Sequence, residues 1–192
     1  MEAFMRQGVL DAVIGLLMRD GVQGITMDRV AMEAGVAKGT LYVYFKNKEE
    51  ILDAAVEASF EPLIVELTGI MDADKAPDKR LEDFSRLNLQ FFDEQQDLIR
   101  ILFYDRERIH SEKNRFNDDR YLTLLSKVAE VLNEGVDTGL FAPMDSMKIA
   151  AMFIEANMGM VMQRIRDGIS GDVEQDARQI ISIFMEGLRR KQ

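Results

Sequence analysis

Two short helix-forming runs joined by a turn that begins with a glycine constrain the first quarter of this sequence most strongly. The first run, 26–34, opens with a threonine, a good N-cap, and carries Asp28 where the positive end of a helix favours an acid. Gly35 supplies the left-handed position that ends many helices, and the apolar Val36 follows it. The second run covers about 38–44. Two short helices joined in this way predict a helix-turn-helix.

A small apolar wedge is predicted to join these two helices to a preceding helix at 3–20. The wedge consists of Val30, Ala31, Val36, Leu41 and Phe45. Apolar–glycine–apolar turns are also common in helical bundles, so this spacing alone leaves DNA binding and plain bundle packing both open.

The residues themselves decide more than their spacing. The run Gly35-Val36-Ala37-Lys38-Gly39-Thr40-Leu41-Tyr42-Val43-Tyr44-Phe45-Lys46-Asn47-Lys48-Glu49-Glu50-Ile51-Leu52 closely resembles the N-terminal domain of the TetR/AcrR family. The resemblance covers about residues 6–55; beyond 55 only the number and arrangement of helices match. It implies a homodimeric one-component regulator, usually a repressor, that a small ligand releases from DNA.

Two positions depart from the family pattern. Ala37 stands where the family often has a serine N-cap, which sacrifices a cap worth ~1 kcal/mol. Leu17 stands where the family often has phenylalanine, an exchange that a core tolerates.

The matching positions and their chemistry predict which residues contact double-stranded DNA. Polar and aromatic side chains of the second short helix would face the DNA, and its glycine would allow close backbone approach. Two further residues would hold phosphates at helix N-termini, where backbone amides favour anions. The predicted set is Thr26, Lys38, Gly39, Thr40, Tyr42, Tyr44 and Lys48. The alternative for Tyr42 and Tyr44 is a surface aromatic packed on the first helix.

The rest of the chain also reads as helix, which predicts an all-α protein of about nine helices. No segment alternates convincingly between polar and apolar residues, and the chain has only three prolines. We expect a helix-turn-helix domain at 1–47 and a helical ligand-binding and dimerisation domain at 48–192. Pro62 falls inside the helix predicted from 48 to 70 and should kink it near Ala58.

The helix predicted at 145–167 has no polar face through its middle, and a helix that is apolar all round must be covered on all sides. The helix at 172–189 adds an apolar stripe. Together they predict a homodimer built through these two helices. The interface residues would be Phe153, Gly159, Ile180 and Phe184. The alternative is a core made entirely within one chain.

Aromatic residues of the larger domain predict a cavity for an apolar or amphipathic small-molecule effector. The expected ligand-binding set is Phe84, Asn88, Phe91, Phe103, Tyr104, Tyr121, Phe153 and Asn157. An aromatic stripe is more often plain core, so a DNA-binding or protein-interaction module without ligand stays open as a rival hypothesis.

Composition limits the other function classes. Net charge is −10, but residues 1–52 hold six Lys/Arg against seven Asp/Glu, so the acidic excess belongs to the remainder and does not exclude DNA binding. With no cysteine and the single histidine His110, no metal site, cofactor or catalytic triad is predicted, and an enzyme built on paired carboxylates is a remote alternative.

The start carries an acid, and no uncharged run approaches the ~20 residues of a membrane span. We therefore expect a cytoplasmic protein without membrane contact.

Overall fold

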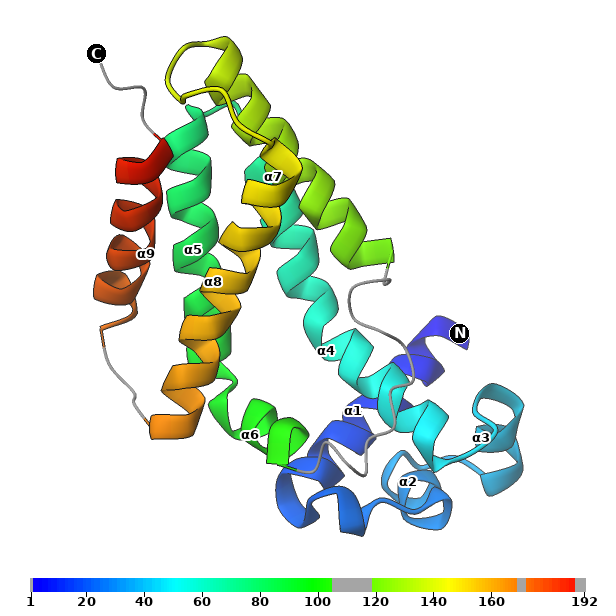
Figure 1. Cartoon of the computed structure of the whole chain (residues 1–192). Helices are drawn as coiled ribbons and strands as arrows, with labels where there is room; N and C mark the ends of the chain where they lie inside the picture. Colours follow the sequence, from blue (N-terminus) through cyan, green and yellow to red (C-terminus); the bar gives the residue numbers. More distant parts are fainter. Residues whose placement is uncertain (1, 105–118, 169–171, 189–192) are drawn as a thin grey trace. The chain divides into compact units, whose positions relative to one another are not determined.

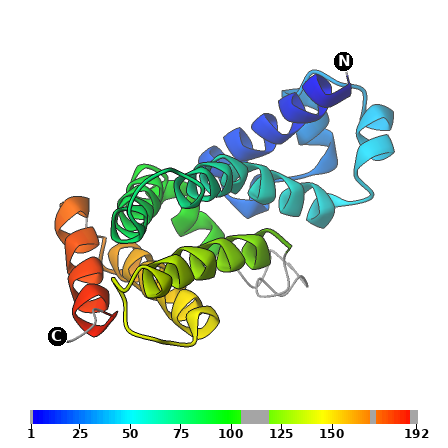
Figure 2. The same ribbon diagram turned by 90° about the horizontal axis from the view of Figure 1, so that it is seen from above.

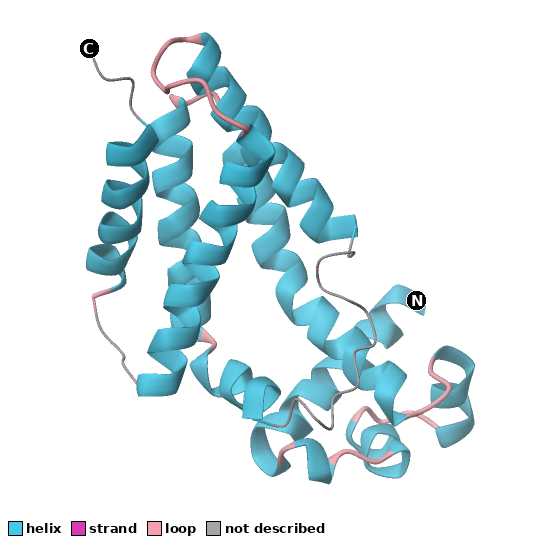
Figure 3. Cartoon of the chain, in the orientation of Figure 1, coloured by secondary structure: helices cyan, strands magenta, loops and turns pink. Residues whose placement is uncertain are grey.

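The computed structural model describes residues 2–104, 119–168 and 172–188. Figures 1 and 3 show that these residues form helices joined by loops. The nine α-helices of the described part are α1 (Glu2–Asp20), α2 (Met27–Glu33), α3 (Lys38–Tyr44), α4 (Lys48–Met71), α5 (Pro77–Glu94), α6 (Gln96–Tyr104), α7 (Asp119–Asp137), α8 (Ser146–Asp167) and α9 (Val173–Leu188). The all-α prediction is confirmed, and the bounds of the six helices predicted above agree to within one or two residues.

The chain divides into two compact units. The described parts of 1–62 and 95–112 form the first unit, and those of 63–94 and 113–192 form the second. Helix α4 contributes to both units, and the division along it falls directly after Pro62. The predicted domain boundary at 47/48 stays a prediction, as does the kink.

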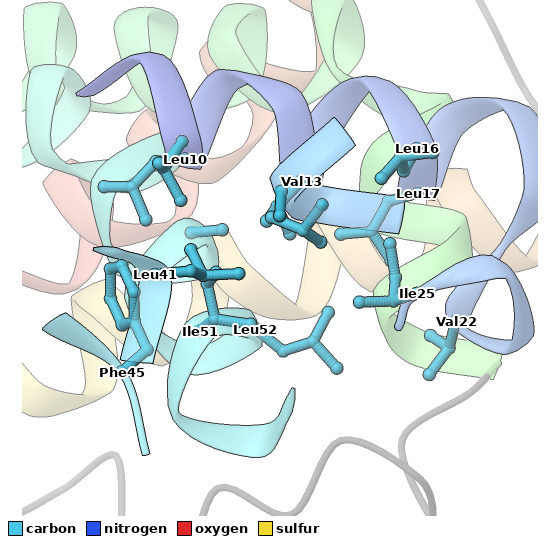
Figure 4. Close-up of a cluster of buried hydrophobic side chains, with 14 residues drawn as sticks. Leu10, Val13, Leu16, Leu17, Val22, Ile25, Leu41, Phe45, Ile51 and Leu52 are labelled. Atoms are coloured by element: carbon cyan, nitrogen blue, oxygen red, sulfur yellow. The ribbon is translucent and has the colours of Figure 1, made fainter. Parts of the chain in front are cut away.

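A buried apolar cluster organises the first unit. Figure 4 shows side chains of α1, among them Leu10, Val13 and Leu17, meeting Leu41 and Ile51 from the α3 and α4 segments. All five are nearly inaccessible to solvent. The ring of Phe45, directly after α3, closes the cluster. The wedge predicted from sequence is therefore present, with Val36 only half-buried at its edge.

Local capping explains why α2 and α3 are short and separate. The Thr26 side chain accepts a hydrogen bond from the backbone N–H of Arg29, 3.2 Å away, at the start of α2. At its end, Gly35 adopts a φ of 67°, and the Val36 N–H donates to the Ala31 carbonyl at 3.0 Å. An L-residue with a side chain would be strained at Gly35. As expected, Ala37 offers no side-chain cap to α3.

The second unit is built around α5, α8 and α9. Helices α5 and α8 run in the same direction, and α9 runs in the opposite direction beside them (Figures 1 and 2). Arg164 of α8, almost fully buried, links the three helices: it pairs with Asp93 of α5 at 2.7 Å and with Asp176 of α9. A buried cation held by two carboxylates fixes how these helices align along their length.

Part of the dimer prediction is wrong in detail. Phe153 and Ile180 are 1% and 5% exposed within a single unit, because α9 lays most of its apolar stripe against the chain's own core. Neither residue is available to a partner. Gly159 is exposed and Phe184 half-buried, and the exposed apolar residues on the two helices include Met152 and Ile183.

No helix in the described part of the chain is both long and apolar enough to cross a membrane.

Candidate nucleic-acid interface

Helix α3 presents one buried side and one open side. Leu41 is fully buried, whereas Lys38, Gly39 and Tyr42 are exposed and Thr40 is half-buried. A Cβ atom added at Gly39 would meet no other atom within 4 Å, so no contact within the described chain requires glycine there. The open side therefore combines one cation, a bare stretch of backbone and polar hydroxyls, which suits the surface of a duplex.

Lys38 is paired within the motif. Its Nζ lies 2.7 Å from Oδ1 of Asp28, in the first turn of α2, and this hydrogen bond is the main cause that raises the pKa of Lys38. Both side chains are more than half exposed. The pair links the starts of α2 and α3 while leaving Lys38 within reach of an incoming phosphate.

The two predicted phosphate contacts, Thr26 and Lys48, differ in the hydrogen bonds that they already make within the chain. The Thr26 side chain already accepts the capping hydrogen bond at α2, but the residue is exposed and its hydroxyl proton remains able to donate. Lys48 is half-buried, and its Nζ donates to the Val22 carbonyl at 2.7 Å, which ties α4 to the α1–α2 connection. Two of its three protons remain for a phosphate.

The two tyrosines are also unequal. Tyr42 is 48% exposed and stands on the open side of α3. Tyr44 is half-buried and packs against the apolar cluster of the first unit. The packed-aromatic alternative thus describes the ring of Tyr44, whereas Tyr42 fits the predicted exposed position.

Two arginines of α1 and α2 are held by acids of the same unit. Arg29 donates to the Gly24 carbonyl at 2.9 Å and pairs with Asp20. Arg19 makes two hydrogen bonds of 2.9 Å to Glu33, and these lower the pKa of that carboxyl. These pairs hold α2 against the end of α1, which fixes the platform that carries α3.

The predicted ligand set is only partly assembled. Phe84 and Phe153 lie with ring centroids 5.3 Å apart, and Phe184 meets Phe153 at 5.2 Å. Asn88 and Asn157 are buried in the same unit, one turn after Phe84 on α5 and Phe153 on α8. Phe91 and Tyr121 are half-buried on α5 and α7. Phe103 and Tyr104 belong to α6, in the other unit, and their side chains lie outside those described.

A separate groove of about 470 Å³ opens at the surface of the second unit, and none of the predicted ligand residues lines it. It lies between the end of α4 and α5, and its walls carry the paired charges Lys75, Asp83 and Arg86. Its mixed charge distinguishes it from the aromatic interior.

Comparison with known proteins agrees with this geometry. Residues 9–55 match the model of the bacterial regulatory proteins of the tetR family. Over 188 residues the chain is 23% identical to the HTH-type transcriptional repressor KstR2 of Mycobacterium tuberculosis, covering 97% of this chain and 94% of that protein. The N-terminal segment of this chain, residues 9–55, is therefore of the TetR family.

Solved structures with the same fold cover nearly the whole chain. A TetR transcription regulator from Haloarcula marismortui has a TM-score of 0.77 at 19% identity, covering 98% of this chain and 100% of that one. FadR from Bacillus subtilis, solved in complex with stearoyl-CoA, has a TM-score of 0.73 at 18% identity, covering 94% and 98%.

Sequence reasoning missed two features of this TetR-family interface. Val43 is 78% exposed on α3. The feature of the sequence that could have revealed it is an apolar residue that does not fall on the buried side of that helix. The pairing of Asp28 with Lys38 joins residues ten apart in the chain, and no local pattern indicates it.

No group of His, Asp and Glu in the described part of this regulator could hold a metal ion, and His110 lies outside the described residues.

Proposed function

We propose that this TetR-family regulator is a repressor that binds a pseudo-palindromic operator as a homodimer and is released by a small apolar or amphipathic ligand. The observation that carries the proposal is the open side of α3, with Lys38 and Tyr42 exposed on a helix whose other side is fixed in the core. A reading helix must be rigid on one side and accessible on the other. Because the target is chromosomal DNA, the proposed compartment is the cytoplasm.

The α3 residues divide into two roles. Lys38, Tyr42 and Lys48 would bind phosphates and so fix the position of α3 on the duplex. Thr40 and the exposed Val43 would contact base edges, where a valine suits the methyl group of thymine. Thr26 would hold a phosphate and Gly39 would allow close backbone approach, as expected from sequence, while the ring of Tyr44, packed against the apolar cluster, would support α3.

A second copy of the chain is the proposed cover for α8 and α9. Met152 is 60% exposed and Ile183 64% exposed, although both helices otherwise pack into the core. Exposed Gly159 on α8 would allow close helix approach. A dimer formed there would present two α3 helices to half-sites about 34–36 Å apart, one turn of DNA.

The second unit is the proposed ligand domain. Its interior joins phenylalanine rings of three helices with two buried asparagines, which is the mixture that amphipathic molecules require. The long acyl chain of stearoyl-CoA in the FadR complex is consistent with an apolar ligand. To release DNA 100-fold, a ligand must favour the released state by ~2.7 kcal/mol.

Selection from a random DNA library tests the proposal. The full-length protein should enrich one sequence with two-fold symmetry, and compounds that stabilise the protein in thermal-shift screens should lower its affinity for that sequence. Enrichment of no sequence would refute the DNA-binding role. Stabilising compounds that leave DNA affinity unchanged would favour a DNA binder without an effector.

A further inference from the structure

Three polar side chains are buried in the apolar interior of the second unit. Ser85 is 0% exposed, Asn88 6% and Asn157 1%. Within the part of the chain that the structure describes, each has an atom without a hydrogen-bond partner, namely Ser85 Oγ, Asn88 Nδ2 and Asn157 Oδ1. A buried polar atom left unpaired costs about 1–3 kcal/mol, so three of them together need an explanation.

Two contacts show that the asparagines share one level of the fold. Phe84 of α5 lies against Phe153 of α8, and further along both helices Asp93 lies 2.7 Å from Arg164. The two helices run in the same direction (Figure 1). Asn88 comes four residues after Phe84, as Asn157 comes four residues after Phe153, so each lies one turn beyond the aromatic pair.

The two amides therefore form a polar layer between an aromatic layer and an ionic layer. Helix α9 repeats this order in the opposite direction, with Phe184 against Phe153 and Asp176 against Arg164. Between them on α9 lies Ile180, which is buried and offers no polar side chain. Of the three residues at this level, Asn88, Asn157 and Ile180, the two amides are therefore the groups that can form hydrogen bonds.

The unpaired atoms define the chemistry of a guest. The Asn157 Nδ2 donates to the Phe153 carbonyl at 2.9 Å, which leaves its Oδ1 as an unsatisfied acceptor. The unsatisfied Nδ2 of Asn88 is a donor. A group that satisfies both must accept one hydrogen bond and donate another. A hydroxyl group does this, whereas an ionised carboxylate or an ether only accepts and an ammonium only donates.

Charge leads to the same class of guest. The cation nearest along α8 is Arg164, and two carboxylates, Asp93 and Asp176, already neutralise it. An anionic group placed at the amide layer would be desolvated without a free cation to pair with it, which is unfavourable.

We propose that the layer formed by Asn88 and Asn157 binds the hydroxyl group of a neutral effector, an alcohol or a phenol, whose apolar body packs against the phenylalanine layer. The inference rests on the proposed function only in taking the second unit as the effector site. The hydroxyl accepts a hydrogen bond from Nδ2 of Asn88 and donates one to Oδ1 of Asn157. Ser85 lies one turn before Asn88 on α5.

Three probes that differ only at the polar end test the proposal. They are 1-decanol, its methyl ether and decanoate, titrated calorimetrically into the full-length wild-type protein at pH 7.5. The alcohol should bind at least about tenfold more tightly than the ether or the anion, because only the alcohol satisfies both amides. Two variants, Asn88→Leu and Asn157→Leu, should reduce this preference to within about twofold.

The melting temperature separates a binding role from a structural one. Replacing a buried amide that has an unpaired atom by an apolar side chain of similar size should leave the melting temperature of the ligand-free protein unchanged or raise it. Gln90→Leu is the matched control, because Gln90 is an exposed amide on α5 that lines the surface groove. It should keep the preference of the wild type. Ser85→Ala provides a third test should a leucine variant fail to fold.

The proposal is overturned if the wild type binds no probe, if the ether or decanoate binds as tightly as the alcohol, or if the preference survives in the asparagine variants. Loss of the preference in Gln90→Leu alone would assign the probes to the groove and overturn it as well. Operator binding without probe is measured on the same samples. Failure of the wild type to bind DNA would count against the regulator itself, and intact DNA binding with no alcohol preference would count against the hydroxyl site alone.

Discussion

Nζ of Lys38, the first residue of α3, lies 2.7 Å from Oδ1 of Asp28 in the first turn of α2. This pair orients Lys38 but also neutralises the one cation among the exposed residues of α3. A DNA phosphate must therefore compete with Asp28 for the same ammonium group. The acid lowers the affinity for phosphates at any sequence, and sequence-specific contacts must then supply more of the binding energy.

Substituting Asp28→Asn should strengthen DNA binding. The change frees Lys38 for one phosphate, so the plot of log K against log salt should steepen by about 0.9. Non-specific affinity should rise more than operator affinity, and the preference for the operator should fall. Fluorescence anisotropy with operator and scrambled duplexes over a salt series measures both effects.

Two further variants control for simple charge removal. Glu33→Gln removes an acid of the same α2 helix that pairs with Arg19 instead, and it should change the slope far less. In a Lys38→Ala background, Asp28→Asn should have little effect. An equal gain in that background would show that Asp28 acts by general repulsion and not through Lys38.

The two tyrosines of α3 should respond differently to truncation. Tyr42→Ala should weaken operator binding about tenfold and leave the melting temperature unchanged, because this side chain is 48% exposed. Tyr44→Ala should also destabilise the fold, by about 1–2 kcal/mol, because its ring packs against the core. Anisotropy and thermal denaturation on the same preparations compare them; equal melting temperatures would contradict the difference.

The helix-turn-helix was predictable because its determinants are local. Thr26, Gly35 and the apolar positions at Leu41 and Phe45 act within a few residues of one another, and the structure uses each of them as expected. The family motif, residues 35–52, overlaps this segment and is equally local. The exposed Lys38, Gly39 and Tyr42 followed from the family resemblance and their chemistry, whereas the exposed Val43 was missed.

The second unit was less predictable because its pairings are distant in the chain. Phe153 looked like a dimer contact from the composition of α8, yet the ring is buried against Phe84 and Phe184 of the same chain. Most of the apolar stripe of α9 is likewise buried within the same chain. Composition shows that a helix must be covered, but it does not show which helix covers it.

The proposed dimer can be tested where the protomer itself is not disturbed. Ile183→Glu places a charge on an exposed residue of α9, so the subunit should still fold while the dimer dissociates at least tenfold more readily. Val65→Glu is the control, because Val65 is similarly exposed, at 60%, but lies on α4. Sedimentation at micromolar concentration should give a dimer for the wild type and Val65→Glu. A folded wild-type monomer would refute the dimer.

Stability in acid should depend in part on Asp83. Burial by itself would raise the pKa of this carboxyl, but hydrogen bonds and charges from Lys75 and Arg86 outweigh burial and lower the pKa overall. The stabilisation is therefore present above the unfolded pKa, about 3.9, and is lost as the pH falls below it. Asp83→Asn should make the unfolding free energy fall less between pH 5 and pH 3. An unchanged slope would contradict this role.

The spacing between half-sites tests the central claim most directly. Once a symmetric site has been selected, its half-sites are separated by successive insertions of one to ten base pairs, and operator affinity is measured for each duplex at one salt concentration. A dimer that reads two half-sites one helical turn apart should lose at least about tenfold in affinity at half a turn, because the second α3 then faces away from its major groove. Affinity that does not change with spacing would contradict two-headed recognition by α3.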